Sequence, residues 1–262
     1  MKVQKTQSQS PWVWTWAGAC AGMALALLLN APAHWLTQSV QHASGGQLLL
    51  KAPRGTVWQG SAQLVLSGGP GSTDAAALPG RLSWQIRPAL SGFSVQLLAD
   101  CCMQQAWQIS LQPTWGGAKL TLSDSLSQWP ATVLAGLGTP WNTVQAEGQL
   151  SLSTQGLSAQ WSSGGLRLSG QAQLNAQHLA SRLSTLKPMG SYRLTLSGGP
   201  TPALKLETLE GSLQLTGNGQ WVGGKLRFDG VASATPERQE ALANLLNIIG
   251  RRDGARALIK IG

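Results

Sequence analysis

The sequence has few charged residues. Asp, Glu, Lys and Arg make up 11% of its 262 residues, whereas an ordinary soluble domain has roughly 25%. The net charge is nevertheless +9, because 19 Lys and Arg face only 10 Asp and Glu. A basic balance attracts nucleic acid, anionic lipid or an acidic protein, and charge alone does not distinguish them. Hydrophobic residues make up 42% of the chain, which argues against a disordered protein.

Histidine is scarce as well, and this limits the available chemistry. Only His34, His42 and His178 are present, so no histidine cluster is predicted to hold a metal. The sequence lacks GxSxG, HExxH and a lysine-containing phosphate loop. The acids are scattered, and a pair such as Glu237 with Glu240 is interpreted as a solvated helix face rather than a glycosidase pair. We therefore expect no catalytic residue, no metal and no cofactor.

The three cysteines do not form a conventional disulfide framework. Cys20 lies in an apolar N-terminal segment, and Cys101 and Cys102 are adjacent. A bridge between neighbouring cysteines would be strained. The pair is therefore interpreted as two small apolar residues near the end of a strand, and a redox switch is the alternative.

Tryptophan is the one abundant aromatic residue, with 12 Trp against 1 Tyr and 2 Phe. These rings are interpreted mainly as core or rim packing. A sugar-stacking surface is the alternative, which would suit a cell-wall binder or hydrolase.

The N-terminal region has no charged residue between Lys5 and Lys51. Its apolar run is long enough to predict a membrane-spanning helix, with tryptophans near both ends, where such rings favour the headgroup layer. The predicted organisation is a cytoplasmic lead over residues 1–11, a transmembrane signal anchor over 12–36, a linker over 37–46 and a periplasmic β-rich domain over 47–262. Because Lys2 and Lys5 should stay cytoplasmic, the chain is expected in a bacterial inner membrane as a single-pass protein with its bulk in the periplasm.

A cleavable signal peptide is the competing interpretation of this region. The sequence Ala31-Pro32-Ala33 is similar to a small-residue cleavage site, although the apolar run exceeds the usual signal core. A mature chain beginning at His34 would contradict the anchor. In either case the domain lies outside the cytoplasm, so nucleic acid is not an expected partner.

Beyond this region, many segments alternate apolar and polar residues, as in "GRLSWQI" and "SYRLTLSGG". This period of two indicates antiparallel strands with one buried face. Glycine pairs between the segments are typical of tight hairpins. The predicted fold is mainly β: an N-terminal transmembrane helix followed by a large antiparallel sheet, curled into a partial barrel or groove, with a few short helices.

Three segments are predicted as the short helices. Two are Ser125 to Leu137 and Gln177 to Leu186. The third begins after Thr235, a predicted N-cap that is followed by Pro236 at the first helical position. Its predicted apolar face comprises Leu242, Leu245, Leu246 and Ile249, and Gly250 is expected to end it.

The C-terminal stretch "GRRDGARALIKIG" then predicts a turn and a final strand. Arg251, Arg252, Asp253 and Arg256 place several charges around Gly254. An ion pair between Asp253 and a neighbouring arginine would contribute about 0–1 kcal/mol if exposed. The turn is therefore predicted to be structural, and its net positive charge makes it a candidate docking point for an acidic partner or anionic headgroups.

Several stretches resemble the type II secretion system protein N family. They are "KAPRGTVWQGSAQL", "LPGRLSWQI", "LSTLKPMGSYRLTL" and "LLNIIGRRDGARALIKIG". The resemblance implies a non-enzymatic inner-membrane component that supports assembly or stability of the platform exporting folded proteins across the outer membrane. It also implies other inner-membrane secretion components as partners. A second hypothesis is a membrane-tethered β-groove that binds lipid or acyl chains.

Overall fold

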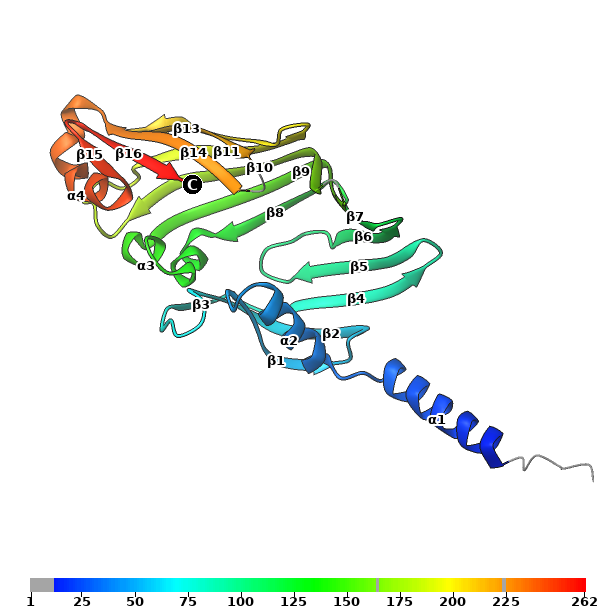
Figure 1. Cartoon of the computed structure of the whole chain (residues 1–262). Coiled ribbons are helices and arrows are strands. Elements are labelled where there is room, and N and C mark those ends of the chain that lie inside the picture. Colours follow the sequence, from blue (N-terminus) through cyan, green and yellow to red (C-terminus); the bar gives the residue numbers. More distant parts are fainter. Residues whose placement is uncertain (1–11, 164, 223–224) are drawn as a thin grey trace, which may run out of the picture.

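The computed structural model describes residues 12–163, 165–222 and 225–262 and is dominated by one antiparallel sheet (Figure 1). The mainly β prediction is confirmed, since the described residues form a 16-stranded sheet. Its strand order is β1-β2-β4-β5-β6-β7-β9-β10-β11-β12-β13-β14-β16-β15, with β3 paired to β2 and β8 paired to β9.

The first eight strands are β1 (Leu48–Gly55), β2 (Gln59–Ser67), β3 (Ala75–Ala77), β4 (Leu82–Ala89), β5 (Gly92–Ala99), β6 (Trp107–Thr114), β7 (Gly117–Leu122) and β8 (Ser125–Pro130). The others are β9 (Ala146–Ser162), β10 (Gly165–Ser181), β11 (Gly190–Gly199), β12 (Ala203–Gly211), β13 (Leu213–Val222), β14 (Lys225–Ala234), β15 (Arg251–Asp253) and β16 (Arg256–Ile261).

The sheet is neither closed nor strongly curled, which differs from the predicted partial barrel. Among the described residues, β1 and β15 lie at opposite ends of the strand order and do not pair with each other. Alternation determines which face of each strand is buried. It does not determine whether the first and last strands meet, so the sequence pattern alone did not distinguish an open sheet from a closed one.

One face of the sheet carries the apolar side chains, and short helices cover parts of it. The strand registers place Trp84 opposite Leu97, and Leu194 opposite both Leu174 and Leu206. Three hydrophobic clusters form where helices pack on this face, and Leu242 is fully buried in the largest of them. The covering elements are α2 (Ala33–Ala43), the 3₁₀ helix η1 (Ala131–Leu137), α3 (Trp141–Val144), the 3₁₀ turn η2 (Pro236–Arg238) and α4 (Gln239–Ile249).

The N-terminal region forms two helices instead of the one predicted over residues 12–36. Helix α1 spans Trp12–Leu29 and α2 begins at Ala33. The break occurs at Pro32, whose backbone is extended and forms a bridge with Thr56. Proline has no N–H to donate and disfavours the helical conformation of the residue before it. Within the described residues, no helix combines the length and apolar character needed to cross a membrane. The predicted cytoplasmic lead lies outside the described residues.

The other helix predictions have mixed outcomes. Residues 131–137 form η1, but the segment before it is strand β8. The helix predicted from Gln177 to Leu186 was wrong, because β10 continues to Ser181. A bulge at His178, with φ of 50°, shifts the register against both neighbouring strands there. Such a bulge interrupts the alternation of period two from which strands are predicted.

Candidate functional site

The predicted C-terminal turn is a short hairpin at one edge of the sheet. Strand β15 pairs with β16, which places Asp253 opposite Arg256 and Arg251 opposite Leu258. Gly254 has φ of 61° in the connecting turn, a conformation that glycine adopts without steric cost. The hairpin therefore brings all four predicted docking residues into one small region.

Helix α4 holds this hairpin against the sheet. The predicted apolar face is confirmed, since Leu242, Leu245 and Leu246 are buried and Ile249 packs against them. Burying each leucine is worth roughly 1.5–3 kcal/mol. The predicted cap is not formed: η2 precedes α4, and Thr235 makes no side-chain capping hydrogen bond.

Gly250 ends α4 in a different way from the predicted cap. Its φ of −167° is extended, so no left-handed cap is present. A Cβ at this position would lie 2.6 Å from the Leu258 carbonyl oxygen, closer than normal packing allows. Gly250 therefore permits the close approach of the chain to β16 as it leaves α4.

The charges of the turn are exposed and uncompensated. Arg251, Arg252, Asp253 and Arg256 are all exposed. No ion pair within 4 Å joins these four side chains to any part of the chain that the structure describes. Asp253 therefore does not form the ion pair with a neighbouring arginine that the sequence allows, and the arginines of the turn stay available.

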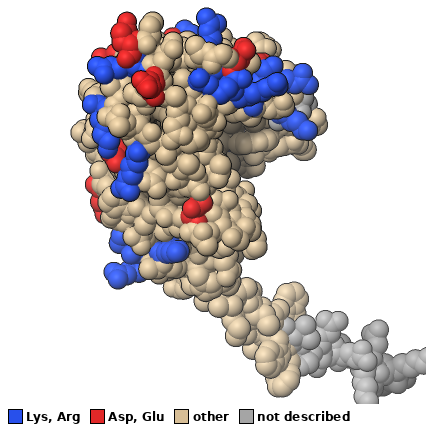
Figure 2. All heavy atoms as spheres, turned by 90° about the vertical axis from the view of Figure 1, so that its left-hand side faces the viewer, with Lys and Arg blue, Asp and Glu red and all other residues tan. Residues whose placement is uncertain are grey.

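The polar face of the neighbouring strands carries further charges. Lys260 of β16 lies 3.8 Å from Asp229 of β14, measured between Nζ and Oδ1, and both side chains are exposed. A shallow recess of about 560 Å³ lies beside Asp229 and includes Lys205 and Arg227. The sequence did not predict this recess, because its lining residues belong to four strands, β11 to β14, and come together only when these strands pair. Figure 2 shows Lys and Arg side chains together with Asp and Glu side chains on the upper part of the molecule.

Two ion-pair clusters also lie on the surface, each centred on a half-buried glutamate. Glu147 accepts hydrogen bonds from Lys187 at 3.2 Å and Arg182 at 3.4 Å, and the Lys187 hydrogen bond is the main reason that the pKa of Glu147 is lowered. Glu207 lies 2.6 Å from Lys205, and this contact lowers the pKa of Glu207. Surface pairs of this kind contribute little to stability.

The adjacent cysteines form a disulfide, so their interpretation as unbonded residues was wrong. Cys101 and Cys102 are bonded at the turn between β5 and β6. Successive side chains of a strand point to opposite faces. Here the chain turns, and the two sulfur atoms meet. Cys102 is buried in an apolar cluster, as predicted for a small apolar residue near the end of a strand.

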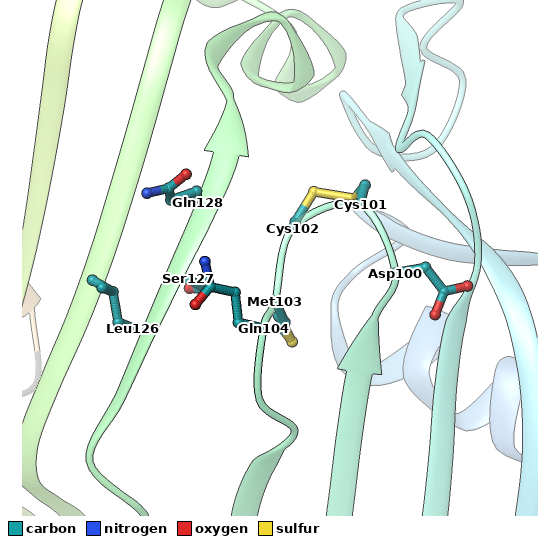
Figure 3. Close-up of a pocket in the computed structure, with 8 residues that line it drawn as sticks. All are labelled: Asp100, Cys101, Cys102, Met103, Gln104, Leu126, Ser127 and Gln128. Atoms are coloured by element: carbon teal, nitrogen blue, oxygen red, sulfur yellow. A yellow bond between two sulfur atoms is a disulfide. The ribbon is translucent and has the colours of Figure 1, made fainter.

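A polar recess of about 180 Å³ lies next to this disulfide (Figure 3). Gln128 of β8 donates its backbone N–H to the Cys102 carbonyl oxygen at 2.8 Å. The buried hydroxyl of Ser127 accepts a hydrogen bond from Trp129 Nε1 at 2.8 Å and donates to the Leu152 carbonyl oxygen at 3.5 Å, so it is not hydrogen-bonded to Asp100, which also lines the recess. Ser127 therefore has no base to activate it as a nucleophile. No group of three His, Cys, Asp or Glu that could hold a metal occurs in the described ranges.

Comparison with known proteins identifies the family. The family model for the type II secretion system protein N matches residues 46–259, which include nearly the entire sheet and the C-terminal turn. No curated protein and no solved structure matched the chain significantly. Membership implies a structural component of a Gram-negative envelope machine, with other secretion components as partners and without enzymatic activity. The chain belongs to the type II secretion system protein N family.

Proposed function

We propose that this chain is a scaffold of the type II secretion machinery, attached to the bacterial inner membrane with its sheet in the periplasm. In this role it supports assembly or stability of the platform that exports folded proteins across the outer membrane. The match of the family model to residues 46–259 carries the proposal.

Helix α1 supports the proposed membrane attachment. Its apolar side chains, including Trp14, Met23 and Leu27, are exposed. Figure 1 shows α1 projecting from the sheet. An uncharged apolar helix left uncovered by its own chain is suited to contact with lipid.

The C-terminal turn is the proposed docking point for an acidic partner among the inner-membrane secretion components. Arg251, Arg252 and Arg256 are exposed without an ion pair in the described ranges. The turn lies at the opposite end of the strands from α1 (Figure 1). It therefore points away from the proposed membrane, where a periplasmic domain of a partner can reach it.

Photo-crosslinking in cells tests this docking point. A photoreactive amino acid at Ala255, which is exposed between β15 and β16, should crosslink to another secretion component. Arg251→Gln with Arg252→Gln should reduce the crosslink and the export of secreted enzymes. Each exposed ion pair contributes roughly 0.2–1 kcal/mol, so the double change weakens the contact by about two- to thirtyfold.

A matched control distinguishes docking from a general loss of charge. Arg182→Gln with Arg238→Gln removes the same charge outside the turn and should leave the crosslink intact. Normal thermal unfolding of both double variants would show that the fold is preserved. Unchanged crosslinking and export in the Arg251 and Arg252 variant would contradict the docking role.

A second candidate function, binding of lipid or acyl chains, is favoured by the uncovered part of the apolar face. The registers align Phe93 with Leu111 and Trp161 with Leu166, and these four side chains are exposed. Figure 2 shows a hollow beneath the overhanging upper part of the molecule.

Native mass spectrometry after mild extraction tests this candidate function. A co-purified lipid that is lost in a Leu111→Asp variant would support lipid binding. Repeated absence of lipid would argue for the scaffold alone.

A further inference from the structure

The hairpin turns at one end of the sheet lie beside the end of α1. Trp58 Nε1, in the β1–β2 turn, donates a hydrogen bond to the Leu28 carbonyl oxygen at 2.8 Å. Gln59, the first residue of β2, pairs with Gln85 in the middle of β4, and the later residues of β2 pair with the start of β4 at Leu82. The β1–β2 turn therefore lies at the same end of the strands as the β4–β5 turn. Figure 1 shows α1 leaving at this end, with the β4–β5, β6–β7 and β9–β10 hairpins pointing to the same side.

Two of these turns carry large apolar side chains that the protein does not cover. Leu90 in the β4–β5 turn and Trp115 in the β6–β7 turn have relative exposures of 112% and 105%. Turns of soluble proteins usually carry polar residues or glycine. Exposed leucine and tryptophan at neighbouring hairpin tips are typical of residues that enter the boundary of a bilayer.

The charges that lie nearest to the same turns in the sequence are positive. The charged residue closest in sequence to each turn at the α1 end is a lysine or an arginine: Arg54, Arg87, Lys119, Arg167, Lys205 and Lys225. At the opposite end acids occur beside the turns, including Asp74, Asp100 and Glu210. Figure 2, which looks onto that opposite end, shows acidic side chains among the basic ones. The turns at the end where α1 leaves the sheet are therefore more uniformly basic than those at the opposite end, where the arginines of the C-terminal turn lie among acids.

We propose that this end of the sheet rests on an anionic phospholipid bilayer, with Leu90 and Trp115 entering its surface and the flanking cations binding lipid phosphates. Charge complementarity supports a bilayer as the occupant, since each basic residue near an anionic surface strengthens binding. The position of α1 also supports a bilayer as the occupant, because a membrane-attached α1 would hold these turns near the same bilayer. The inference rests on the proposed attachment through α1 and adds a second contact that orients the sheet.

Fluorophores attached to single cysteines of the full-length chain test the proposal. Cys20 is the free cysteine, because Cys101 and Cys102 are bonded to each other. A label on Cys20 therefore reports the position of α1. In a Cys20→Ala background, Leu90→Cys and Trp115→Cys report the two hairpin tips, and Ala255→Cys reports the opposite end. All three sites are exposed, so none of these changes removes a packed side chain.

The labelled proteins are reconstituted into vesicles of phosphatidylethanolamine and phosphatidylglycerol. Labels at positions 90 and 115 should be quenched by a lipid-borne quencher and protected from a water-soluble one, whereas the label at 255 should behave in the opposite way. Arg87→Gln and Arg167→Gln should each shift the tip labels toward water by up to about fivefold. Arg238→Gln, at the opposite end, should not shift them.

The outcomes separate this inference from the proposed attachment. If the label on Cys20 is in lipid while those at 90 and 115 are as water-accessible as the one at 255, the second contact is wrong and the attachment stands. Lipid exposure of all the labelled sites, including 255, would also contradict the proposed orientation. A water-accessible label on Cys20 would overturn both ideas.

Discussion

Trp58 and Leu28 connect the sheet to its N-terminal helix. The indole N–H of Trp58 donates to the Leu28 carbonyl oxygen at 2.8 Å, in the last turn of α1. Nearby, the Val57 N–H donates to the Ala31 carbonyl oxygen at 2.8 Å. These bonds satisfy carbonyl groups that a helix end leaves without an intrahelical donor, and they determine where α1 leaves the sheet.

Replacing Trp58 by phenylalanine should loosen this connection. Trp58→Phe keeps the ring but removes the donor, and an intramolecular hydrogen bond contributes about 0.5–1.5 kcal/mol. We expect faster hydrogen exchange and proteolysis around residues 29–32, with little change in the sheet. Trp115→Phe is the matched control, because Trp115 is fully exposed. Equal protection of residues 29–32 in both variants would show that the hydrogen bond does not hold α1 in place.

Truncating the buried face of α4 should destabilise the domain. Leu245 is buried in the main apolar cluster, and a Leu→Ala change in a core costs about 2–5 kcal/mol. Leu245→Ala should lower the free energy of unfolding in urea by that amount. Asn247 lies on the exposed side of the same helix, so Asn247→Ala should change it by less than about 0.5 kcal/mol. Similar effects of the two changes would mean that α4 does not dock on the sheet.

The two glycines around β15 should differ in their tolerance of alanine. At Gly250 a Cβ would meet the Leu258 carbonyl oxygen at 2.6 Å, whereas at Gly254 it would meet open space. The overpacking at Gly250 should destabilise the fold by about 1–3 kcal/mol. Gly254→Ala should cost only roughly 1–2 kcal/mol, because alanine must adopt the left-handed backbone of this position. We expect faster exchange of the β15 and β16 amides in Gly250→Ala, measured by NMR. A larger loss of protection in Gly254→Ala would contradict the close approach described for Gly250.

The pKa of Glu147 should depend more on Lys187 than on Arg182. The Lys187 hydrogen bond is the largest cause of the lowered pKa, so Lys187→Gln should raise the pKa more than Arg182→Gln does. Because the pKa is lowered in the folded state, the small stabilisation is present above the unfolded pKa and is lost as the pH falls through the folded pKa. Carboxyl NMR titration measures this. Lys205→Gln is the control: it should raise the pKa of Glu207 and leave that of Glu147 unchanged.

The strands were predictable from the sequence because burial on one face imposes a period of two. The segment from Ser191 to Leu196 alternates in sequence, and β11 runs through it. Helix α4 was predictable for the same reason, since Leu242, Leu245 and Leu246 follow the helical period. In both cases the signal is local and arises from residues close together in the chain.

The features that were missed depend on relationships between distant segments or on local exceptions. The bulge at His178 interrupts the alternation, and the bridge from Pro32 to Thr56 divides the N-terminal helix. The C-terminal turn forms where the sequence predicts a turn, but its docking role stays a prediction, and the recess beside Asp229 is formed by residues of several strands. Leu90 and Trp115 had a visible signal, an apolar residue in a turn, but their common position emerged only once the strands were paired.

The two outer strands carry features that oppose the growth of filaments from the sheet edges. A large open sheet offers unpaired backbone groups at both edges, and such edges promote association between copies. Here β15 is only 3 residues long and carries Arg251 and Arg252. A second copy approaching this edge therefore finds few unpaired backbone groups and is repelled by the like charge. The opposite edge strand, β1, contains Pro53, which lacks an N–H, and a register shift between Lys51 and Arg54. Both edges therefore carry features that oppose edge-to-edge aggregation of this wide, open sheet.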